Sequence, residues 1–166
     1  MINNLKKNLI NILIVFTIFF LDRLSKIFVI SQNEKSLSAD LFSSKFLNIS
    51  LIWNQGIAFG LFSFEQSRLY DFLTIFITIV VIVILFMILK NNGVKKFSLL
   101  MILGGALGNL YDRVFFKAVP DFIDFHIGNF HWFIFNVSDI FISLGVLILI
   151  YLELINNKKN EINEKN

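Results

Sequence analysis

The stretch FLTIFITIVVIVILFMIL at residues 72–89 decides the fold, because it contains no charged residue. It is as long as a membrane-spanning helix, which needs about 17 to 25 apolar residues. Its many β-branched residues would favour a strand in water. In lipid, a single segment must satisfy its own backbone hydrogen bonds and therefore forms a helix. We predict a transmembrane helix at this position.

The composition of the whole chain agrees with this prediction. Of its 166 residues, 56% are hydrophobic and 16% aromatic, with 21 Phe, which is too apolar for a water-soluble domain of this size. Disorder is excluded for the same reason. The absence of cysteine excludes disulfides, a thiolate nucleophile, cysteine-ligated metals and cysteine-linked lipid anchors. The net charge of +3 is too small to indicate nucleic-acid binding.

Working outward from residues 72–89, four apolar stretches predict spans at about 9–29, 69–89, 94–112 and 136–155. We therefore expect an all-α polytopic membrane protein with a single domain at residues 1–155. The polar segment NNKKNEINEKN at 156–166 is expected to be a disordered tail. The third span contains Gly104, Gly105 and Gly108, which let neighbouring helices approach closely, so we place it inside the bundle.

The first stretch has an alternative interpretation as a cleaved signal peptide, because Lys6 and Lys7 precede it. It lacks a small-residue cleavage site and continues into Asp22, Arg23 and Lys26, which favours a retained helix. The outer segments, about 31–68 and 113–135, are expected to form short strands or interfacial segments. Within them, residues 43–62 partly alternate and residues 122–135 are rich in aromatic side chains.

The basic residues predict the orientation of the chain. By the positive-inside rule, three basic regions place both termini and the loop between the second and third spans in the cytoplasm. These regions contain Lys6, Lys7, Lys90, Lys95, Lys96, Lys158, Lys159 and Lys165. The rule is obeyed imperfectly, because further basic residues fall on the other side: Arg23, Lys26, Lys35, Lys45, Arg68, Arg113 and Lys117.

Every aspartate lies at or beyond the outer ends of the predicted helices. These residues are Asp22, Asp40, Asp71, Asp112, Asp121, Asp124 and Asp139. Ionisable groups at membrane depth are costly and mark functional sites, so this one-sided cluster is a site hypothesis. For Asp40 and Asp71 we favour the alternative that they only end helices at the headgroup level.

Asp121 and Asp139 are the candidates for a reactive pair. With Asn136 as the N-cap, Asp139 is at the third position of the last helix, where a carboxylate is stabilised; an ordinary helix-start acid is the alternative. Pro120 keeps Asp121 on an extended segment, which would let it face Asp139. Two adjacent carboxyl groups share one proton. The anion, which we expect to be Asp139, can then activate water, while the acid protonates the carbonyl oxygen and later the leaving amine.

Four blocks of the sequence carry a resemblance to a known family. They are LDRLSK at 21–26, WNQGIAFGLF at 53–62, GGALGNLYDRVFFKAVPDFIDF at 104–125 and FNVSDIFISLGV at 135–146. Together they resemble lipoprotein signal peptidase (signal peptidase II) along nearly the whole chain. The resemblance implies an aspartyl endopeptidase of the bacterial inner membrane that acts near the periplasmic face. Its substrates would be prolipoproteins carrying diacylglyceryl, and its inhibitors globomycin-type cyclic peptides.

In that family the acid pair corresponds to Asp121 and Asp139 of this chain. The resemblance also implies a set of supporting or substrate-binding residues: Asp22, Lys26, Asn54, Gly56, Asn109, Asp112, Arg113 and Asn136. No cofactor or metal is implied. Two positions depart from the family pattern, where Pro120 replaces valine and Ser138 replaces alanine. Neither change removes a catalytic group, so we expect activity to be retained.

The supporting residues also have physical interpretations of their own. Asp22 and Lys26 are spaced for an ion pair on one helix face, and the three asparagines can hold extended backbone by donating and accepting. For Asp112 and Arg113 we favour a structural ion-pair network over a direct catalytic role. Gly56 is either a tight turn or a place where substrate backbone passes closely.

Aromatic residues and histidines outside this set are interpreted as structural rather than catalytic. Four aromatic residues are predicted as interfacial anchors: Trp53, Phe59, Phe62 and Trp132. His126 and His131 lie near Asp124, but their spacing does not indicate a metal site.

Two rival functions belong to other classes. Intramembrane acids also occur in proton-coupled transporters and ion pathways, but these distribute acids through the membrane or show repeated halves, and this chain shows neither. A structural membrane subunit without chemistry is the other alternative. It would tolerate replacement of Asp121 or Asp139 by Asn.

Overall fold

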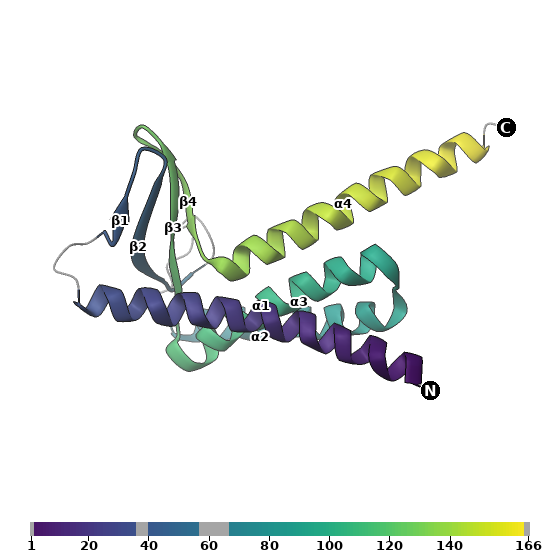
Figure 1. The fold of residues 1–166 in the computed structure, drawn as a ribbon, viewed down its shortest axis with the longest axis horizontal. Helices are drawn as coiled ribbons and strands as arrows, with labels where there is room; N and C mark the ends of the chain where they lie inside the picture. The colour runs from purple at the N-terminus through teal and green to yellow at the C-terminus, as the bar shows by residue number, and fades with distance from the viewer. Residues whose placement is uncertain (1, 36–39, 57–66, 165–166) are drawn as a thin grey trace.

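The computed structural model describes residues 2–35, 40–56 and 67–164. These form the helices α1 (Ile2–Lys35), α2 (Ser67–Lys90), α3 (Gly93–Phe116) and α4 (Val137–Glu164). A small β-sheet stands at one end of the helices, and both chain termini lie toward the other end (Figure 1). The site-bearing segments are therefore concentrated at the end that carries the sheet.

The predicted spans 9–29, 69–89 and 94–112 lie within α1, α2 and α3, and the fourth, 136–155, begins one residue before α4. Within the described residues, three segments are long and apolar enough to cross a membrane: Tyr70–Lys90, Gly93–Phe116 and Val137–Asn157. The outward side chains of α2 are exposed, including Phe72 at 69% and Leu89 at 79%. Large apolar side chains in this position are suited to contact with lipid. The predicted span 9–29 lies inside α1.

The helix ends differ from the predicted bounds, most clearly at the C-terminus. The segment 156–166 was expected to be disordered, but α4 continues as a helix through Glu164. That expectation was wrong, because the segment contains neither glycine nor proline to end a helix that is already formed. α1 likewise starts before the apolar stretch and ends after it, at Lys35.

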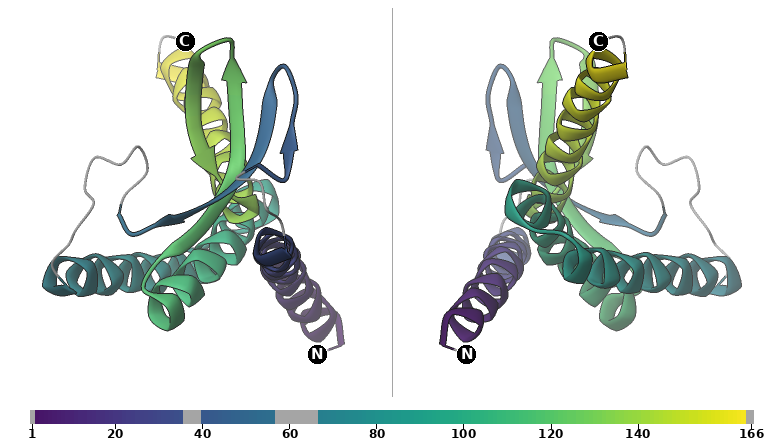
Figure 2. Two further views of the ribbon diagram at one scale, coloured as in Figure 1. Left: turned by 90° about the vertical axis from the view of Figure 1, so that its left-hand side faces the viewer. Right: turned by 90° about the vertical axis from the view of Figure 1, so that its right-hand side faces the viewer.

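α3 is the centre of the bundle and packs against each of the other three helices. Its buried face includes Leu99, Leu100 and Leu103, which pack against Val81 and Ile84 of α2. The views in Figure 2 show the other helices spreading outward around it. The predicted position of the third span inside the bundle is therefore confirmed.

The glycines of α3 allow this packing. A Cβ atom at Gly105 would lie 2.5 Å from the backbone oxygen of Ser138, and one at Gly108 would lie 2.6 Å from Oδ2 of Asp22. Both distances are too short for real atoms, so α4 and α1 approach α3 only because these positions lack side chains.

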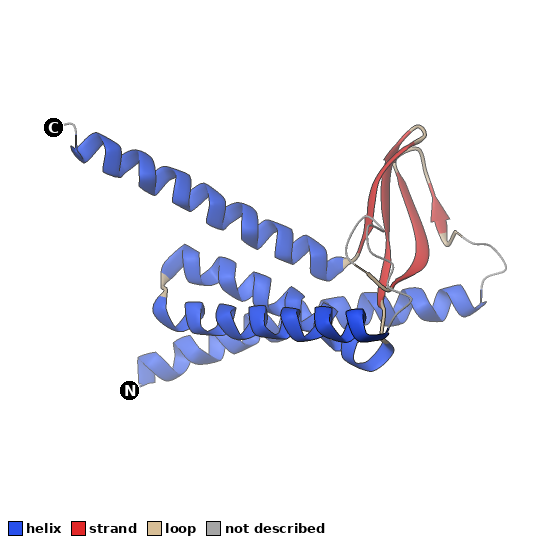
Figure 3. Cartoon of the chain, turned by 180° about the vertical axis from the view of Figure 1, so that it is seen from behind, coloured by secondary structure: helices blue, strands red, loops and turns tan. Residues whose placement is uncertain are grey.

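The outer segments form a four-stranded antiparallel sheet in the order β1-β2-β3-β4, seen from behind in Figure 3. The strands are β1 (Phe42–Ser43), β2 (Leu47–Asn54), β3 (Val119–Ile127) and β4 (Phe130–Phe135). Strands were expected here, but their union into one sheet was not, because β2 and β3 are separated in sequence by α2 and α3. In the sheet, Ile52 is opposite Asp121 and Trp53 is opposite Pro120.

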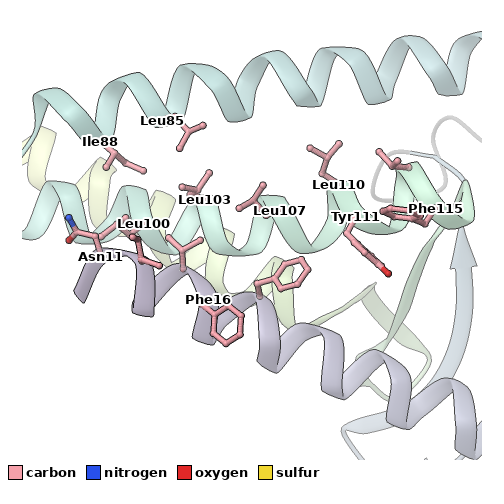
Figure 4. Close-up of a pocket in the computed structure, with 14 residues that line it drawn as sticks. Asn11, Phe16, Leu85, Ile88, Leu100, Leu103, Leu107, Leu110, Tyr111 and Phe115 are labelled. Atoms are coloured by element: carbon pink, nitrogen blue, oxygen red, sulfur yellow. The ribbon is translucent and has the colours of Figure 1, made fainter. Parts of the chain in front are cut away.

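A separate hollow of about 660 Å³ runs along α3 between α1 and α2 (Figure 4). Its walls are almost entirely apolar, with Val15 and Phe16 from α1, Leu85 from α2 and Leu103 and Leu107 from α3. No carboxyl group lines it. Tyr111 is the only titratable residue among those that line this larger hollow, whereas Asp121 and Asp139 line a smaller cavity.

Candidate active site

Asp121 and Asp139 come from different elements and line the same cavity. Asp121 is a buried residue of β3, and Asp139 lies in the first turn of α4. The cavity has a volume of about 260 Å³, and Asn54, Asn109 and Arg113 also line it. The structure thus brings together the two carboxyl groups that the sequence marked as a pair.

The start of α4 fixes the carboxyl group of Asp139. Asn136 precedes the helix, and its Oδ1 accepts a hydrogen bond from the backbone N–H of Asp139 at 3.2 Å. In return, the backbone N–H of Asn136 donates to Oδ2 of Asp139 at 3.1 Å. This reciprocal pair is a capping box with Asn and Asp in place of the usual residues. The predicted N-cap at Asn136 is confirmed.

Asparagine side chains hold the remaining carboxyl oxygens. Nδ2 of Asn54 donates to Oδ2 of Asp121 at 2.8 Å, and Nδ2 of Asn136 donates to Oδ1 of Asp121 at 2.6 Å. Nδ2 of Asn109 donates to Oδ1 of Asp139 at 2.8 Å. Each of the four carboxyl oxygens therefore accepts one N–H bond. Because a carboxylate oxygen has two lone pairs, each keeps capacity for water or substrate.

The side chain of Asp121 is buried, with only 4% of the residue's surface exposed, and this burial affects the pKa of its carboxyl group. Burial is the largest cause that raises the pKa of this carboxyl group to about 6, and the negative charge of Asp139 raises it further. The hydrogen bonds from Asn54 and Asn136 act in the opposite direction. Asp121 therefore retains a proton more readily than an ordinary aspartate near neutral pH.

A buried ion-pair network lies behind the cavity and joins α1 to α3. Nζ of Lys26 lies 2.9 Å from Oδ1 of Asp22 and 2.7 Å from Oδ2 of Asp112. Arg23 binds the same two carboxylates, at 2.9 Å from Asp22 and 2.6 Å from Asp112. The predicted pairing of Asp22 with Lys26 is confirmed. Oδ1 of Asp22 also accepts the backbone N–H of Ser138 at 3.0 Å, which ties α4 to the network.

Sequence reasoning placed Asp112 and Arg113 together in such a network, and only half of that interpretation is correct. Asp112 pairs with Arg23 and Lys26, whereas Arg113 lines the cavity and donates from Nη1 to the backbone oxygen of Asn109 at 3.1 Å. Consecutive helix residues point in directions about 100° apart, so the two side chains diverge.

Arg23 is the supporting residue that the sequence analysis missed. It was counted only as a charge, in the arguments for a retained first helix and for the orientation of the chain. In the structure it bridges both buried aspartates and stacks over the ring of Tyr111 at 4.8 Å. The available signal was the run of charged residues in LDRLSK, because charges inside an apolar helix require partners.

The remaining predicted residues lie as follows. The backbone N–H of Gly56, a buried residue, donates to Oδ1 of Asn54 at 2.9 Å, which supports the turn interpretation. Trp53 and Trp132 are both exposed, as expected of interfacial anchors. Phe59 and Phe62 lie outside the described residues.

Other charged or titratable residues considered in the sequence lie outside the cavity. Asp71 pairs with Lys117 at 2.8 Å. Nδ1 of His131 lies 2.8 Å from Oδ2 of Asp124, and its ring stacks on that of His126. Among the residues that the structure describes, no group of histidines and acids is arranged to hold a metal ion.

Two carboxyl groups in one small polar cavity of a membrane protein are typical of the class of aspartic hydrolases, in which such a pair activates water in place of a nucleophilic side chain. Within that class, the chain belongs to the family described as Signal peptidase (SPase) II, which matches residues 14–155.

Known proteins similar to this chain agree with that assignment. It is 49% identical to the lipoprotein signal peptidase of Pelagibacter ubique (strain HTCC1062), over 98% of both chains. It is 35% identical to that of Anaplasma phagocytophilum (strain HZ), over 96% of this chain and 99% of the relative. A solved bacterial membrane enzyme is 29% identical, with a TM-score of 0.75 over 90% of each chain.

The chain is therefore an aspartic peptidase of a membrane enzyme family that cleaves signal peptides from prolipoproteins. These matches do not support the alternative of a proton-coupled transporter. They also argue against a structural subunit without chemistry.

Proposed function

We propose that Asp121 and Asp139 are the catalytic residues of this peptidase. The observation that carries the proposal is the pattern of donors: Asn54, Asn109 and Asn136 approach the two carboxyl groups from the cavity wall and supply one N–H to each oxygen. This arrangement fixes both groups without neutralising either.

In the proposed reaction, Asp139 is the base and Asp121 the acid. Asp139 is at a helix N-terminus, which favours the anion, whereas Asp121 lies on a strand without a helix end and is only 4% exposed, which favours its protonated form. Water adds to the scissile carbonyl carbon as Asp139 takes one water proton and Asp121 protonates the carbonyl oxygen. When the C–N bond breaks, the amine takes the proton held by Asp139 rather than one from Asp121, as the sequence analysis had it, because Asp121 has already given its proton to the carbonyl oxygen. Asp121 then recovers its proton from the diol.

We further propose that the substrate is a prolipoprotein already modified with diacylglyceryl, whose acyl chains remain in the lipid. The walls of the cavity support this, because Val119, Phe133 and Ile142 surround the polar groups with apolar surface. A globomycin-type cyclic peptide would fill the same cavity and exclude the substrate. These expectations rest on the family resemblance, together with the size and position of the cavity.

The proposed setting is the bacterial inner membrane, with four spans that include residues 9–29 of α1. Both termini would be cytoplasmic and the sheet periplasmic. The support is the distribution of basic residues, together with the position of both termini at the end of the helices opposite the sheet (Figure 1). The exposed aromatic side chains Trp53, Phe130 and Trp132 would then lie at the outer membrane–water interface.

Reconstitution of the purified protein tests this proposal directly. Wild type, Asp121→Asn and Asp139→Asn are incubated in lipid vesicles with the modified prolipoprotein and, separately, with its unmodified form. We expect cleavage of the modified form by wild type only, with a loss of at least about 1,000-fold in either variant, because each lacks one proton-transfer group. Full activity in either variant would refute the assignment of catalytic residues. Equal cleavage of both substrates would refute lipid-dependent recognition.

A further inference from the structure

The three asparagine side chains around the acid pair are each held in one orientation. An amide has an oxygen that accepts and a nitrogen that donates, so each asparagine needs a donor on its oxygen side to present its nitrogen to a carboxylate. Oδ1 of Asn54 receives the backbone N–H of Gly56, and Oδ1 of Asn136 receives the backbone N–H of Asp139. In both cases the main chain sets the orientation.

Asn109 differs because its donor is a side chain from another helix. Nζ of Lys26 in α1 donates to Oδ1 of Asn109 at 2.9 Å, and Nδ2 of Asn109 donates to Oδ1 of Asp139 at 2.8 Å. An ammonium group has no acceptor, so the amide nitrogen of Asn109 is excluded from the side that faces Lys26. The nitrogen must then face Asp139.

The bonds of Lys26 show that this contact is more than a by-product of an ion pair. Its side chain is 1% exposed, and its three N–H donors match three acceptors: Asp22, Asp112 and Asn109. The network of Asp22, Arg23, Lys26 and Asp112 has no net charge, so the helices are already joined by balanced pairs. The bond to Asn109 leads directly to a side chain that lines the catalytic cavity, whereas Asp22 reaches this region only through the backbone N–H of Ser138.

We propose that Lys26 is a positioning residue for catalysis, which orients the amide of Asn109 so that it donates to Asp139 and keeps that carboxylate available as the base. This inference rests on the proposed role of Asp139. The charged groups that face Asp139 from the packed elements are Lys26 from α1, Arg113 from α3 and Asp121 from β3. Asp22 and Asp112 lie behind Lys26.

A double-mutant cycle separates positioning from general support. The double variant Lys26→Met/Asp22→Asn removes the ammonium and keeps the buried network neutral. Its activity is compared with that of Asn109→Ala and with that of the triple variant, which carries all three changes. We expect kcat to fall about 10- to 100-fold in the Lys26/Asp22 pair and in Asn109→Ala, because each loses one hydrogen bond to a charged group. KM should change little, and the triple variant should be no slower than Asn109→Ala alone.

The pH profile and a conservative variant complete this test. The acidic limb of the kcat profile should move to higher pH in the Lys26→Met/Asp22→Asn variant and in Asn109→Ala. In each, the carboxylate of Asp139 loses the hydrogen bond from Asn109 and is protonated more easily. Lys26→Arg, which keeps a cation with N–H donors, should restore most of kcat. Losses that multiply in the triple variant, or an acidic limb that stays in place, would overturn the proposal. If the Lys26→Met/Asp22→Asn variant does not fold, Lys26→Arg alone provides the test. A kcat of Lys26→Arg as low as that of Asn109→Ala would overturn the proposal.

A measurement without substrate distinguishes failure of this inference from failure of the proposed function. In the Asp121→Asn background, infrared difference spectra follow the protonated carboxyl band that disappears on further replacement of Asp139 by Asn. As the pH is lowered, this band should appear at a higher pH in the protein that also carries Lys26→Met and Asp22→Asn. This expectation holds whether or not the protein cleaves prolipoprotein. An unchanged band would reject the role of Lys26 even if the wild type is an active peptidase.

Discussion

At the scale of single residues, the carboxyl group of Asp121 links the site to the stability of the protein. Its pKa is raised from 3.8 to about 6, mainly by burial. A group with a raised folded-state pKa stabilises the fold below its unfolded-state pKa, and this contribution is lost as the pH rises through the folded-state value. The difference corresponds to about 3 kcal/mol between pH 3.8 and pH 8.

Asp121→Asn should therefore make stability less dependent on pH. Relative to wild type, the variant should gain free energy of unfolding as the pH rises from 4 to 8, with most of the change between about pH 4 and pH 6, where the unfolded chain has lost this proton and the folded protein still holds it. Chemical unfolding in detergent micelles, measured across this range for both proteins, checks the prediction. Parallel stability curves for the two proteins would contradict it.

At the scale of elements, the position of Asp139, the proposed base, depends on the contact between α3 and the first turn of α4. A Cβ atom at Gly105 would lie 2.5 Å from the carbonyl oxygen of Ser138 and 2.8 Å from Cγ1 of Ile142. Ser138 is adjacent to Asp139, so any shift of this turn also displaces the carboxyl group.

Gly105→Ala should therefore reduce activity more than its loss of stability explains. We expect a cost of about 1 to 3 kcal/mol from overpacking, and a fall in kcat of at least about tenfold from the displaced base. The control is Gly128→Ala in the turn between β3 and β4, where φ is +60° but no atom lies within 4 Å of the added Cβ. It should lose stability through backbone strain and retain kcat. Comparable losses of kcat in both variants would argue against the prediction.

The elements also show what a single sequence can and cannot predict. The apolar stretches located the helices because lipid forces such segments to be helical, and Asn136 marked the start of α4. The sheet register was not predictable, because Ile52 and Asp121 meet only after two helices have returned the chain. The same holds for the polar contacts: Asn54 and Asp121 are 67 positions apart, and Lys26 and Asn109 are 83 apart.

At the scale of the whole molecule, the proposed orientation places the sheet and the loop between α2 and α3 on opposite sides of the membrane. The chain has no cysteine, so single cysteines can report on each side. Asn129, in the turn between β3 and β4, and Asn92, immediately before α3, are both exposed. In spheroplasts, a membrane-impermeant thiol reagent should label Asn129→Cys directly, and Asn92→Cys only after permeabilisation. Labelling of Asn92→Cys in sealed spheroplasts would show that the orientation is inverted or mixed.

The order of the site residues along the chain has a consequence for biosynthesis. The cavity is lined by Asn109 from the third helix, Asp121 from the sheet and Asp139 from the start of the fourth helix, and Lys26 from the first helix binds Asn109. On the proposed mechanism, a chain that has released only its first three helices into the bilayer lacks the base and is inert. Hydrolysis would begin only once α4 docks and brings Asp139 to the cavity, so an unfinished copy could not cut a precursor beside it.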